Sequence, residues 1–291
     1  MSLIELLQSK SLILLDGAMG TQLAALGLEM GGQNCVSHPD EVLSVHRRYA
    51  EAGCDVLTTN TLTMNRISIE SHGLAVDVKD VNLAGAKLAK TAAGPDRYVL
   101  GDISSTGQLL EPYGDYTEEQ FYKNFREQAE YLLAGGADGF IIETILDLRE
   151  ALCALKACRD VSNLPVLVTL SFQTTDNGGR TVMGNAAAES AKALADAGAA
   201  AVGANCGQLD PRETARILDK MKQAVDLPLI AQPNAGKPRL VNGQTVFDMT
   251  PEEFAEGVSA CIEAGASIIG GCCGTTPEHI RRVAERIGKP D

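Results

Sequence analysis

The 291-residue sequence has no tryptophan, only four histidines and few basic residues, and the shortage of basic residues excludes two kinds of partner. Lys and Arg total 25 against 38 Asp and Glu, which gives a formal net charge of −13. A chain this acidic is unsuited to broad contact with nucleic acid or with an anionic membrane, because it would not neutralise their phosphates. We therefore expect neither a nucleic-acid partner nor a membrane partner.

Long apolar segments are also missing. No run approaches the roughly 18 apolar residues that are needed to cross a bilayer. The N-terminal segment MSLIELLQSKSLILLDG lacks the basic region and the small-residue cleavage site of a secretory signal. We therefore expect a cytoplasmic protein whose eight cysteines are free thiols or metal ligands and do not form a disulfide scaffold.

A short pattern recurs along the chain, in which a glycine ends a predicted helix and an apolar strand follows. It occurs within residues 51–60, 134–144, 196–206 and 263–273. Filling in between these segments gives eight candidate strands, each short and apolar without clean alternation, as in parallel strands covered on both faces. The candidates are Leu12–Leu15, Val56–Thr59, Tyr98–Gly101, Gly139–Ile142, Val166–Leu170, Ala201–Ala204, Leu229–Ala231 and Ser267–Gly270.

Segments with helical periodicity separate these strands. The clearest is Thr117–Leu133, where apolar residues recur at three- and four-residue steps and Thr117 begins a capping box. Thr250 and Thr276 each precede a proline at the first position of a further helix. Eight strand–helix alternations predict a (β/α)8 TIM barrel that forms a single domain over residues 1–291. A doubly wound open sheet is the alternative, although its GxGxxG fingerprint is missing.

Polar or thiol residues follow seven of the eight predicted strands. They are Asp16 to Thr21, Asn60, Asp102, Glu143 with Thr144, Asn205 with Cys206, Gln232 to Asn234, and Cys272 with Cys273. Isolated polar residues at strand ends often serve only to form turns. In a barrel, however, all these ends meet at one rim, where the active sites of this architecture lie.

The cysteines at these strand ends are the most informative residues. Cys272 and Cys273 are neighbours with glycines on both sides, and both can reach one ion only if the strand has ended and the backbone turns. Cys206 ends a strand two positions away on the same rim. Three thiolates there would suit Zn²⁺ and leave a fourth coordination position open. Buried structural thiols and a redox switch between Cys272 and Cys273 remain alternatives.

The other cysteines and the histidines give weaker signals. Cysteines on helices act mostly as small apolar residues, and no histidine follows a predicted strand. His279 is expected on the exposed face of the last helix. The cysteines expected only to pack are Cys35, Cys54, Cys153, Cys158 and Cys261.

Six segments, taken in order, resemble the motifs of the zinc-dependent homocysteine S-methyltransferases. They are DGAMGTQL, GCDVLTTNTL, GADGFIIET, GANCG, PNAGKP and GGCCGTTPEHI, between Asp16 and Ile280. PNAGKPRLVNGQTVFDMTPEEFAEGV and ISSTGQLLEPYGDYTEEQFYKNF are most similar to the N-terminal homocysteine-binding module of cobalamin-dependent methionine synthase. The resemblance implies a TIM barrel in which Cys206, Cys272 and Cys273 bind zinc. It also implies that homocysteine sulfur takes the open position and is methylated to give methionine.

The resemblance further implies which residues hold the amino-acid end of homocysteine. These are the motif after the first strand and the glutamate after the fourth, which carry over to Asp16, Gly17, Ala18, Thr21 and Glu143. Carboxylates suit the substrate ammonium, and backbone N–H groups in a glycine-rich turn suit its carboxylate. The alternative for Asp16 is a role in forming the turn, and for Glu143 a buried ion pair with an arginine.

Three amides or acids have less specific expected roles. Asn234 is expected either to complete the zinc shell when substrate is absent or to contact substrate. Asn60 and Asp102 are expected to orient substrate or to hydrogen-bond the groups that hold it.

The methyl donor is less well defined by the sequence. The cobalamin-binding DxHxxG motif is absent, because no histidine has an aspartate two residues before it. We expect a methylcorrinoid carried by a separate protein. S-methylmethionine, S-adenosylmethionine or betaine remain alternative donors, although the absence of tryptophan disfavours a cage for a quaternary ammonium. A non-catalytic barrel with structural zinc or a thiol redox switch is the alternative from another class.

Overall fold

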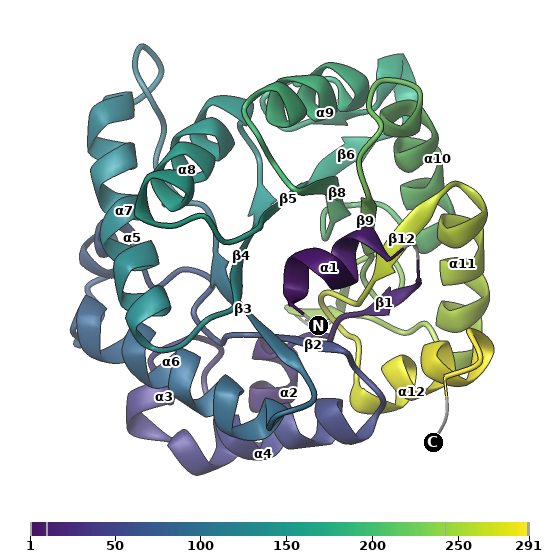
Figure 1. Ribbon diagram of the computed structural model, residues 1–291, viewed down its shortest axis with the longest axis horizontal. Helices are drawn as coiled ribbons and strands as arrows, with labels where there is room; N and C mark the ends of the chain where they lie inside the picture. Colours follow the sequence, from purple (N-terminus) through teal and green to yellow (C-terminus); the bar gives the residue numbers. More distant parts are fainter. Residues whose placement is uncertain (1, 10, 242, 290–291) are drawn as a thin grey trace.

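Eight parallel strands form a barrel with helices around it in the computed structural model, which describes residues 2–9, 11–241 and 243–289 (Figure 1). The strands pair in the order β1-β12-β9-β8-β5-β4-β3-β2, and a parallel bridge from Leu15 to Val56 closes the ring. Closure confirms the (β/α)8 barrel and excludes the open doubly wound sheet. The strands are β1 (Ile13–Leu14), β2 (Val56–Thr58), β3 (Tyr98–Ile103), β4 (Gly139–Ile145), β5 (Val166–Leu170), β8 (Ala201–Asn205), β9 (Leu229–Gln232) and β12 (Ala266–Ile269).

Every predicted strand overlaps one of these, and only the end residues differ. Two short antiparallel hairpins were not predicted. They pair β6 (Phe172–Thr174) with β7 (Arg180–Thr181), and β10 (Arg239–Val241) with β11 (Gln244–Val246). Each hairpin lies in a connection that leaves the carboxyl end of a barrel strand, so both add structure on the side of the polar rim.

The helices form the outer ring (Figure 1). The predicted capping box at Thr117 is present, and the predicted helix starts at Thr250 and Thr276 are capping boxes as well; each threonine accepts a hydrogen bond from the backbone three residues on. The helices are α1 (Leu3–Gln8), α2 (Gly20–Ala25), α3 (Asn34–Ser37), α4 (Pro39–Glu51), α5 (Arg66–Ser71), α6 (Val78–Ala93), α7 (Glu118–Ala134), α8 (Leu148–Val161), α9 (Ala187–Asp196), α10 (Pro211–Lys222), α11 (Pro251–Glu263) and α12 (Pro277–Arg286), with a 3-10 turn at Asp176–Gly178.

The prediction that His279 is exposed was wrong. Its side chain is 6% exposed and lies edge-on to the ring of Phe254, with 5.5 Å between ring centroids. Nδ1 accepts from the N–H of Thr276 (3.3 Å), and Nε2 donates to the carbonyl of Met249 (3.0 Å). The histidine therefore serves as the second partner of a capping box, a role the sequence pattern reserves for Glu or Gln.

Side chains inside the barrel change character along its axis. At the amino ends of the strands the interior is filled by one apolar cluster, to which each barrel strand contributes. Its members are Leu3, Ile13, Leu15, Val56, Leu100, Ile141, Leu167, Ala201, Ile230 and Ile268. Burying each large aliphatic side chain contributes roughly 1.5–3 kcal/mol, so this layer is a strong source of stability.

The amino-terminal end of the barrel is closed by α1. Leu3 of α1 packs in the apolar cluster, and the helix lies across the barrel opening (Figure 1).

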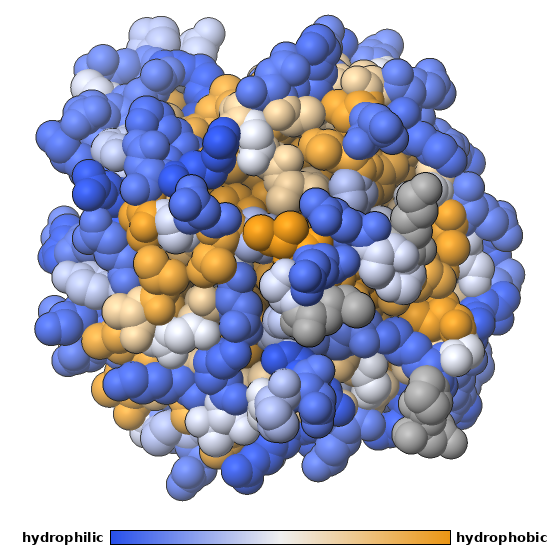
Figure 2. Space-filling model, in the orientation of Figure 1, coloured by the Kyte–Doolittle hydropathy of each residue, from blue (hydrophilic) through white to orange (hydrophobic). Residues whose placement is uncertain are grey.

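In a space-filling view of the same face, hydrophilic residues dominate the outline and hydrophobic residues gather nearer the centre (Figure 2). In the described part of the chain no helix is both long and apolar enough to span a membrane.

The next inward-facing positions toward the carboxyl ends are polar. Because side chains alternate along a strand, the residues two places beyond the apolar cluster also point into the barrel, as does Asn205, which lies four places beyond Ala201. Each of these side chains is less than 9% exposed, so the upper part of the barrel interior is a buried polar layer. It contains Thr58, Asp102, Glu143, Thr169, Asn205 and Gln232.

Candidate metal centre and adjoining cavity

Three cysteine sulfurs meet at the carboxyl end of the barrel. The Sγ atoms of Cys206, Cys272 and Cys273 all lie within 4.8 Å of one another, and those of Cys206 and Cys273 are 3.9 Å apart. Zinc–sulfur bonds of about 2.3 Å in a tetrahedral site place sulfurs roughly 3.8 Å apart. The cluster is therefore able to bind a metal ion of this kind, and the thiol donor set favours zinc.

The backbone turns that collect these sulfurs follow the prediction. β12 ends at Ile269, before the two cysteines, and Gly274 after them has a φ of +80°. The N–H of Cys272 donates to the carbonyl of Pro233 (2.9 Å), and the carbonyl of Cys273 accepts from Ala235 (3.0 Å). Adjacent cysteines can therefore reach one point because they lie in a turn held against the loop after β9.

The electrostatics of the cluster distinguish it from the remaining cysteines. Hydrogen bonds from Cys272 and Cys273 lower the pKa of the Cys206 thiol to about 3, whereas the same contact with Cys206 raises the pKa of Cys272. These three residues are half-buried, while the other five cysteines are buried, as expected for packing residues. All eight are free thiols. A cluster that already holds one thiolate is prepared for a cation.

A cavity of about 260 Å³ opens beside the thiols. Nine of the eleven residues predicted for the site line this cavity. The other two are Cys206, whose sulfur lies beside that of Cys273, and Asn234. The predicted residues that line the cavity are Asp16, Gly17, Ala18, Thr21, Asn60, Asp102, Glu143, Cys272 and Cys273.

Asp16 reaches across to the neighbouring strand. Its carboxylate accepts from the N–H of Thr58 (2.9 Å) and from the Thr58 hydroxyl (3.0 Å). Burial raises the pKa of Asp16 to about 8 in spite of these two hydrogen bonds, and the charge of Glu143 contributes to the rise. The contacts with Thr58 join two barrel strands, so the alternative of a purely local turn-forming role does not describe this residue.

Asp102 and Glu143 are the other carboxyl groups of the cavity. Burial raises the pKa of Asp102 well above its ordinary value, and burial raises that of Glu143 to about 7. Glu143 accepts a hydrogen bond from Nε2 of Gln232 (2.8 Å), so its partner is an amide and not the arginine considered as an alternative. Oδ1 of Asp102 is buried and has no partner among the described residues.

The three acids lie close enough to interact, since the charge of Glu143 contributes to the raised pKa of both Asp16 and Asp102. Buried carboxylates are stabilised only when a positive charge or several donors face them. The arrangement can therefore accept an ammonium group a short distance from the thiols, as a substrate that carries both an ammonium and a thiol would require.

The remaining predicted residues differ in whether their polar groups already have hydrogen-bond partners. Asn60 donates to the carbonyl of Gly31 (3.2 Å) at the cavity wall. Asn234 donates through Nδ2 to the carbonyl of Gly207 (3.0 Å), and its buried Oδ1 has no partner among the described residues. The hydroxyl of Thr21 is buried and likewise without a described partner. The N–H of Ala18, in contrast, is already bonded to Oγ1 of Thr275 (3.0 Å).

Sequence reasoning missed two residues that hold the site together. Gln232, the last residue of β9, fixes Glu143; the sequence placed it at the rim but gave it no role in the site. Thr275 accepts from Ala18 and donates to the carbonyl of Cys272 (2.7 Å), so it ties the first turn to the cysteine turn. A Cβ on Gly17 would lie 2.5 Å from Oγ1 of Thr275, which explains why a glycine stands there.

Comparison with known proteins agrees with this geometry. Residues 13–287 match the family model described as homocysteine S-methyltransferase. The chain is 33% identical to methionine synthase of Mycobacterium leprae and to that of Mycobacterium tuberculosis, covering 94% of this chain but 24% of each relative. It thus spans about a quarter of their length. The metallated structure of the homocysteine methyltransferase MmuM from Escherichia coli is 25% identical, with a TM-score of 0.78 over 97% of this chain and 98% of that chain. The chain therefore belongs to the homocysteine S-methyltransferase family.

Proposed function

We propose that this protein transfers a methyl group to the sulfur of L-homocysteine, giving methionine, with zinc held by Cys206, Cys272 and Cys273. The observation that carries the proposal is the juxtaposition of three thiols within 4.8 Å of one another and three buried carboxyl groups on one cavity. Zinc bound there would lower the pKa of the substrate thiol from its ordinary value of about 8.5, so that the thiol would be ionised at neutral pH.

The carboxyl groups of the cavity bind the substrate ammonium. Asp16, Asp102 and Glu143 are buried and have few donors of their own, so an ammonium relieves the cost of ionising them. The Thr21 hydroxyl, which has no described partner, donates to the substrate carboxylate. Because the Ala18 N–H is engaged by Thr275, Ala18 shapes this turn, while the Thr21 hydroxyl and the Gly17 N–H bind the carboxylate.

The transfer needs no proton acceptor once the substrate sulfur is ionised. Among the described residues that line the cavity none is a histidine, which agrees with this requirement. The buried Oδ1 of Asn234, beside Cys206, would supply an oxygen ligand to zinc when substrate is absent. Asn60 holds the glycine turn after α2 against the cavity, and so orients the substrate from the opposite wall.

The proposed methyl donor is a methylcorrinoid carried by a separate protein. The bond between methyl carbon and cobalt breaks with both electrons left on cobalt, and a sulfur electron pair forms the new bond to carbon. Support for a corrinoid donor comes from the similarity to two methionine synthases. Because MmuM is a relative of nearly equal length, S-methylmethionine, S-adenosylmethionine and betaine are tested as donors alongside it.

The function is tested with zinc-loaded protein, homocysteine and each donor in turn. Loss of the methyl–cobalt absorbance together with formation of methionine supports the corrinoid donor, and turnover with a sulfonium donor alone refutes it. Cys272→Ser is expected to lose zinc and activity. Cys153→Ser changes a buried cysteine outside the cluster and is expected to retain both. Retention of stoichiometric zinc and full activity by Cys272→Ser would refute the zinc site.

A further inference from the structure

β4 contains an irregularity next to the site. Ile142 pairs with Val168 and Ile145 with Leu170, so β4 has one more residue than β5 over this interval. The extra length falls on Glu143 and Thr144, and Thr144 has a φ of +60°. A β-branched residue seldom adopts this left-handed conformation, which persists only where the surroundings enforce it. The bulge ends the inward-facing series at Glu143 and returns Ile145 to the helix-facing core.

The side chain of Asn205 on β8 enforces that conformation. Its Oδ1 accepts from the N–H of Thr144 (2.8 Å) and from the hydroxyl of Thr169 on the intervening strand (2.8 Å). Its Nδ2 donates to Oγ1 of Thr144 (2.7 Å). Asn205 is 2% exposed and Thr169 is fully buried, so water does not compete for these bonds. One amide therefore satisfies both the backbone and the hydroxyl of the strained residue.

The same amide also contacts the metal centre. Nδ2 of Asn205 lies 3.8 Å from Sγ of Cys272, and Asn205 directly precedes Cys206, whose φ is +53°. On the other side, Asn205 is paired in register with Gln232, whose side chain donates to Glu143. Asn205 thus contacts the thiol cluster directly and the residue that follows Glu143.

We propose that Asn205 is a positioning residue that fixes the separation between the thiol cluster and Glu143, and so selects amino acids whose thiol is on the γ carbon. The inference rests on the proposed function, because it assumes that the cluster takes the substrate sulfur and Glu143 its ammonium. A thiol amino acid one methylene shorter, such as cysteine, has a shorter reach between its ammonium and its sulfur, so a fixed separation disfavours it. Discrimination by one methylene is commonly worth 10- to 200-fold.

Asn205→Ala is expected to weaken zinc binding and to relax substrate selection. Residues that orient metal ligands typically change metal affinity 10- to 100-fold, and we expect a loss in that range by chelator competition. The ratio of homocysteine to cysteine affinity is expected to fall at least several-fold, measured through the spectrum of the cobalt-substituted protein. Both measurements are binding readouts and do not depend on turnover.

A second substitution separates the two contacts. Thr144→Gly on the Asn205→Ala background allows the +60° conformation without support, because glycine adopts it freely. The double variant is expected to recover homocysteine affinity and selectivity toward the unsubstituted protein but to keep the weakened zinc binding. Recovery of zinc affinity together with homocysteine affinity, or recovery of neither, would overturn the division of roles.

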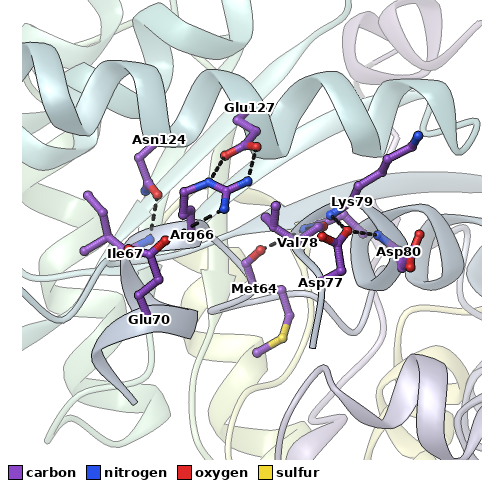
Figure 3. A network of polar contacts seen from close by, with 11 residues as sticks. Met64, Arg66, Ile67, Glu70, Asp77, Val78, Lys79, Asp80, Asn124 and Glu127 are labelled. Carbon is purple, nitrogen blue, oxygen red and sulfur yellow. Dashed lines mark hydrogen bonds and ion pairs between the residues drawn. The ribbon is translucent and has the colours of Figure 1, made fainter. Parts of the chain in front are cut away.

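Asn124→Ala is the matched control for loss of a buried asparagine. Asn124 on α7 accepts from the N–H of Ile67, beside the ion pair of Arg66 with Glu127, and it does not line the cavity (Figure 3). It is expected to lower thermal stability with zinc affinity and selectivity unchanged. If Asn205→Ala fails to fold, Thr169→Val removes one bond to the Asn205 amide with little change of shape and should shift both readouts in the same direction.

The inference and the proposed function fail in different ways. If the unsubstituted protein binds neither zinc nor homocysteine, the function is wrong. If it binds both and Asn205→Ala binds them with unchanged affinity and selectivity, only the positioning role is refuted. Equal losses in Asn124→Ala would also refute it, because they would trace the effect to general destabilisation.

Discussion

Glu143→Gln is expected to make the ligand-free protein more stable and the substrate complex weaker. Glu143 is 8% exposed and accepts a hydrogen bond from Gln232. Glutamine has the same shape and keeps an acceptor for that bond. It also places an N–H donor beside Gln232, whose buried Oε1 has no described partner. The substitution therefore removes a buried charge without removing the hydrogen bond.

The magnitude follows from the raised pKa. Burial raises the pKa of Glu143 from 4.5 to about 7, and at ~1.4 kcal/mol for each pH unit this corresponds to about 3 kcal/mol. Between these pH values the folded protein binds more protons than the unfolded chain, so the stability of the unsubstituted protein falls as pH rises. The stability advantage of Glu143→Gln is thus near zero below about pH 4.5 and approaches its full value above about pH 7.

The assay is urea unfolding of metal-free protein at pH 5 and pH 8, combined with calorimetric titration of the zinc-loaded protein with homocysteine. A charged hydrogen bond contributes about 1.5–3 kcal/mol, so the affinity for homocysteine should fall by roughly 10- to 150-fold. Glu150→Gln is the control, because Glu150 is also buried but bonds Ser105 and Thr106 outside the cavity. A stability difference for Glu143→Gln that is equal at both pH values would refute the reasoning.

Three further perturbations test other parts of the site. Thr275→Val leaves the Ala18 N–H without its acceptor and should destabilise the protein by about 1–3 kcal/mol in urea unfolding, with weaker binding of homocysteine; unchanged binding would contradict the role of Thr275. Gly207→Ala places a Cβ 2.5 Å from the carbonyl of Phe172 at a φ of +74° and should lower zinc affinity in chelator competition, whereas Gly184→Ala, also at positive φ but in open space, should not. Removing zinc with a chelator should lower the melting temperature and excess zinc should restore it, since a metal at a thousand times its Kd stabilises by about 4 kcal/mol; a melting temperature insensitive to zinc would contradict the site.

The sequence was sufficient to predict the barrel because its signals are local. Thr117, Thr250 and Thr276 form capping boxes within a few residues, and each predicted strand is a short apolar segment that ends near a turn. The thiol cluster was also predictable, since the carboxyl ends of parallel strands converge on one rim whatever the details of packing. The family resemblance added the specific expectation of zinc and homocysteine.

Features that depend on distant neighbours were not predictable in the same way. His279 satisfies the helix start of α12 only because the carbonyl of Met249 and the ring of Phe254 lie beside it. The bulge at Thr144 depends on Asn205 two strands away, and nothing in the segment ETILD indicates a positive φ. Gln232 directly follows Ala231 in a buried strand, but its bond to Glu143 requires the ring to be closed.

The two ends of the barrel interior have opposite effects on stability, which explains how a costly site is tolerated. At the carboxyl end, three buried carboxyl groups repel one another and two non-glycine residues, Thr144 and Cys206, have positive φ. Local strain of this kind costs of order 1–3 kcal/mol for each residue and persists only where surrounding structure enforces it. At the amino end, the apolar cluster and α1 supply stability that offsets this cost, through aliphatic side chains that lie away from the cavity. Cations bound at the thiols and at the carboxyl groups would relieve much of the remaining electrostatic cost. The residues that bind ligands therefore lower the stability of the protein most when it is ligand-free.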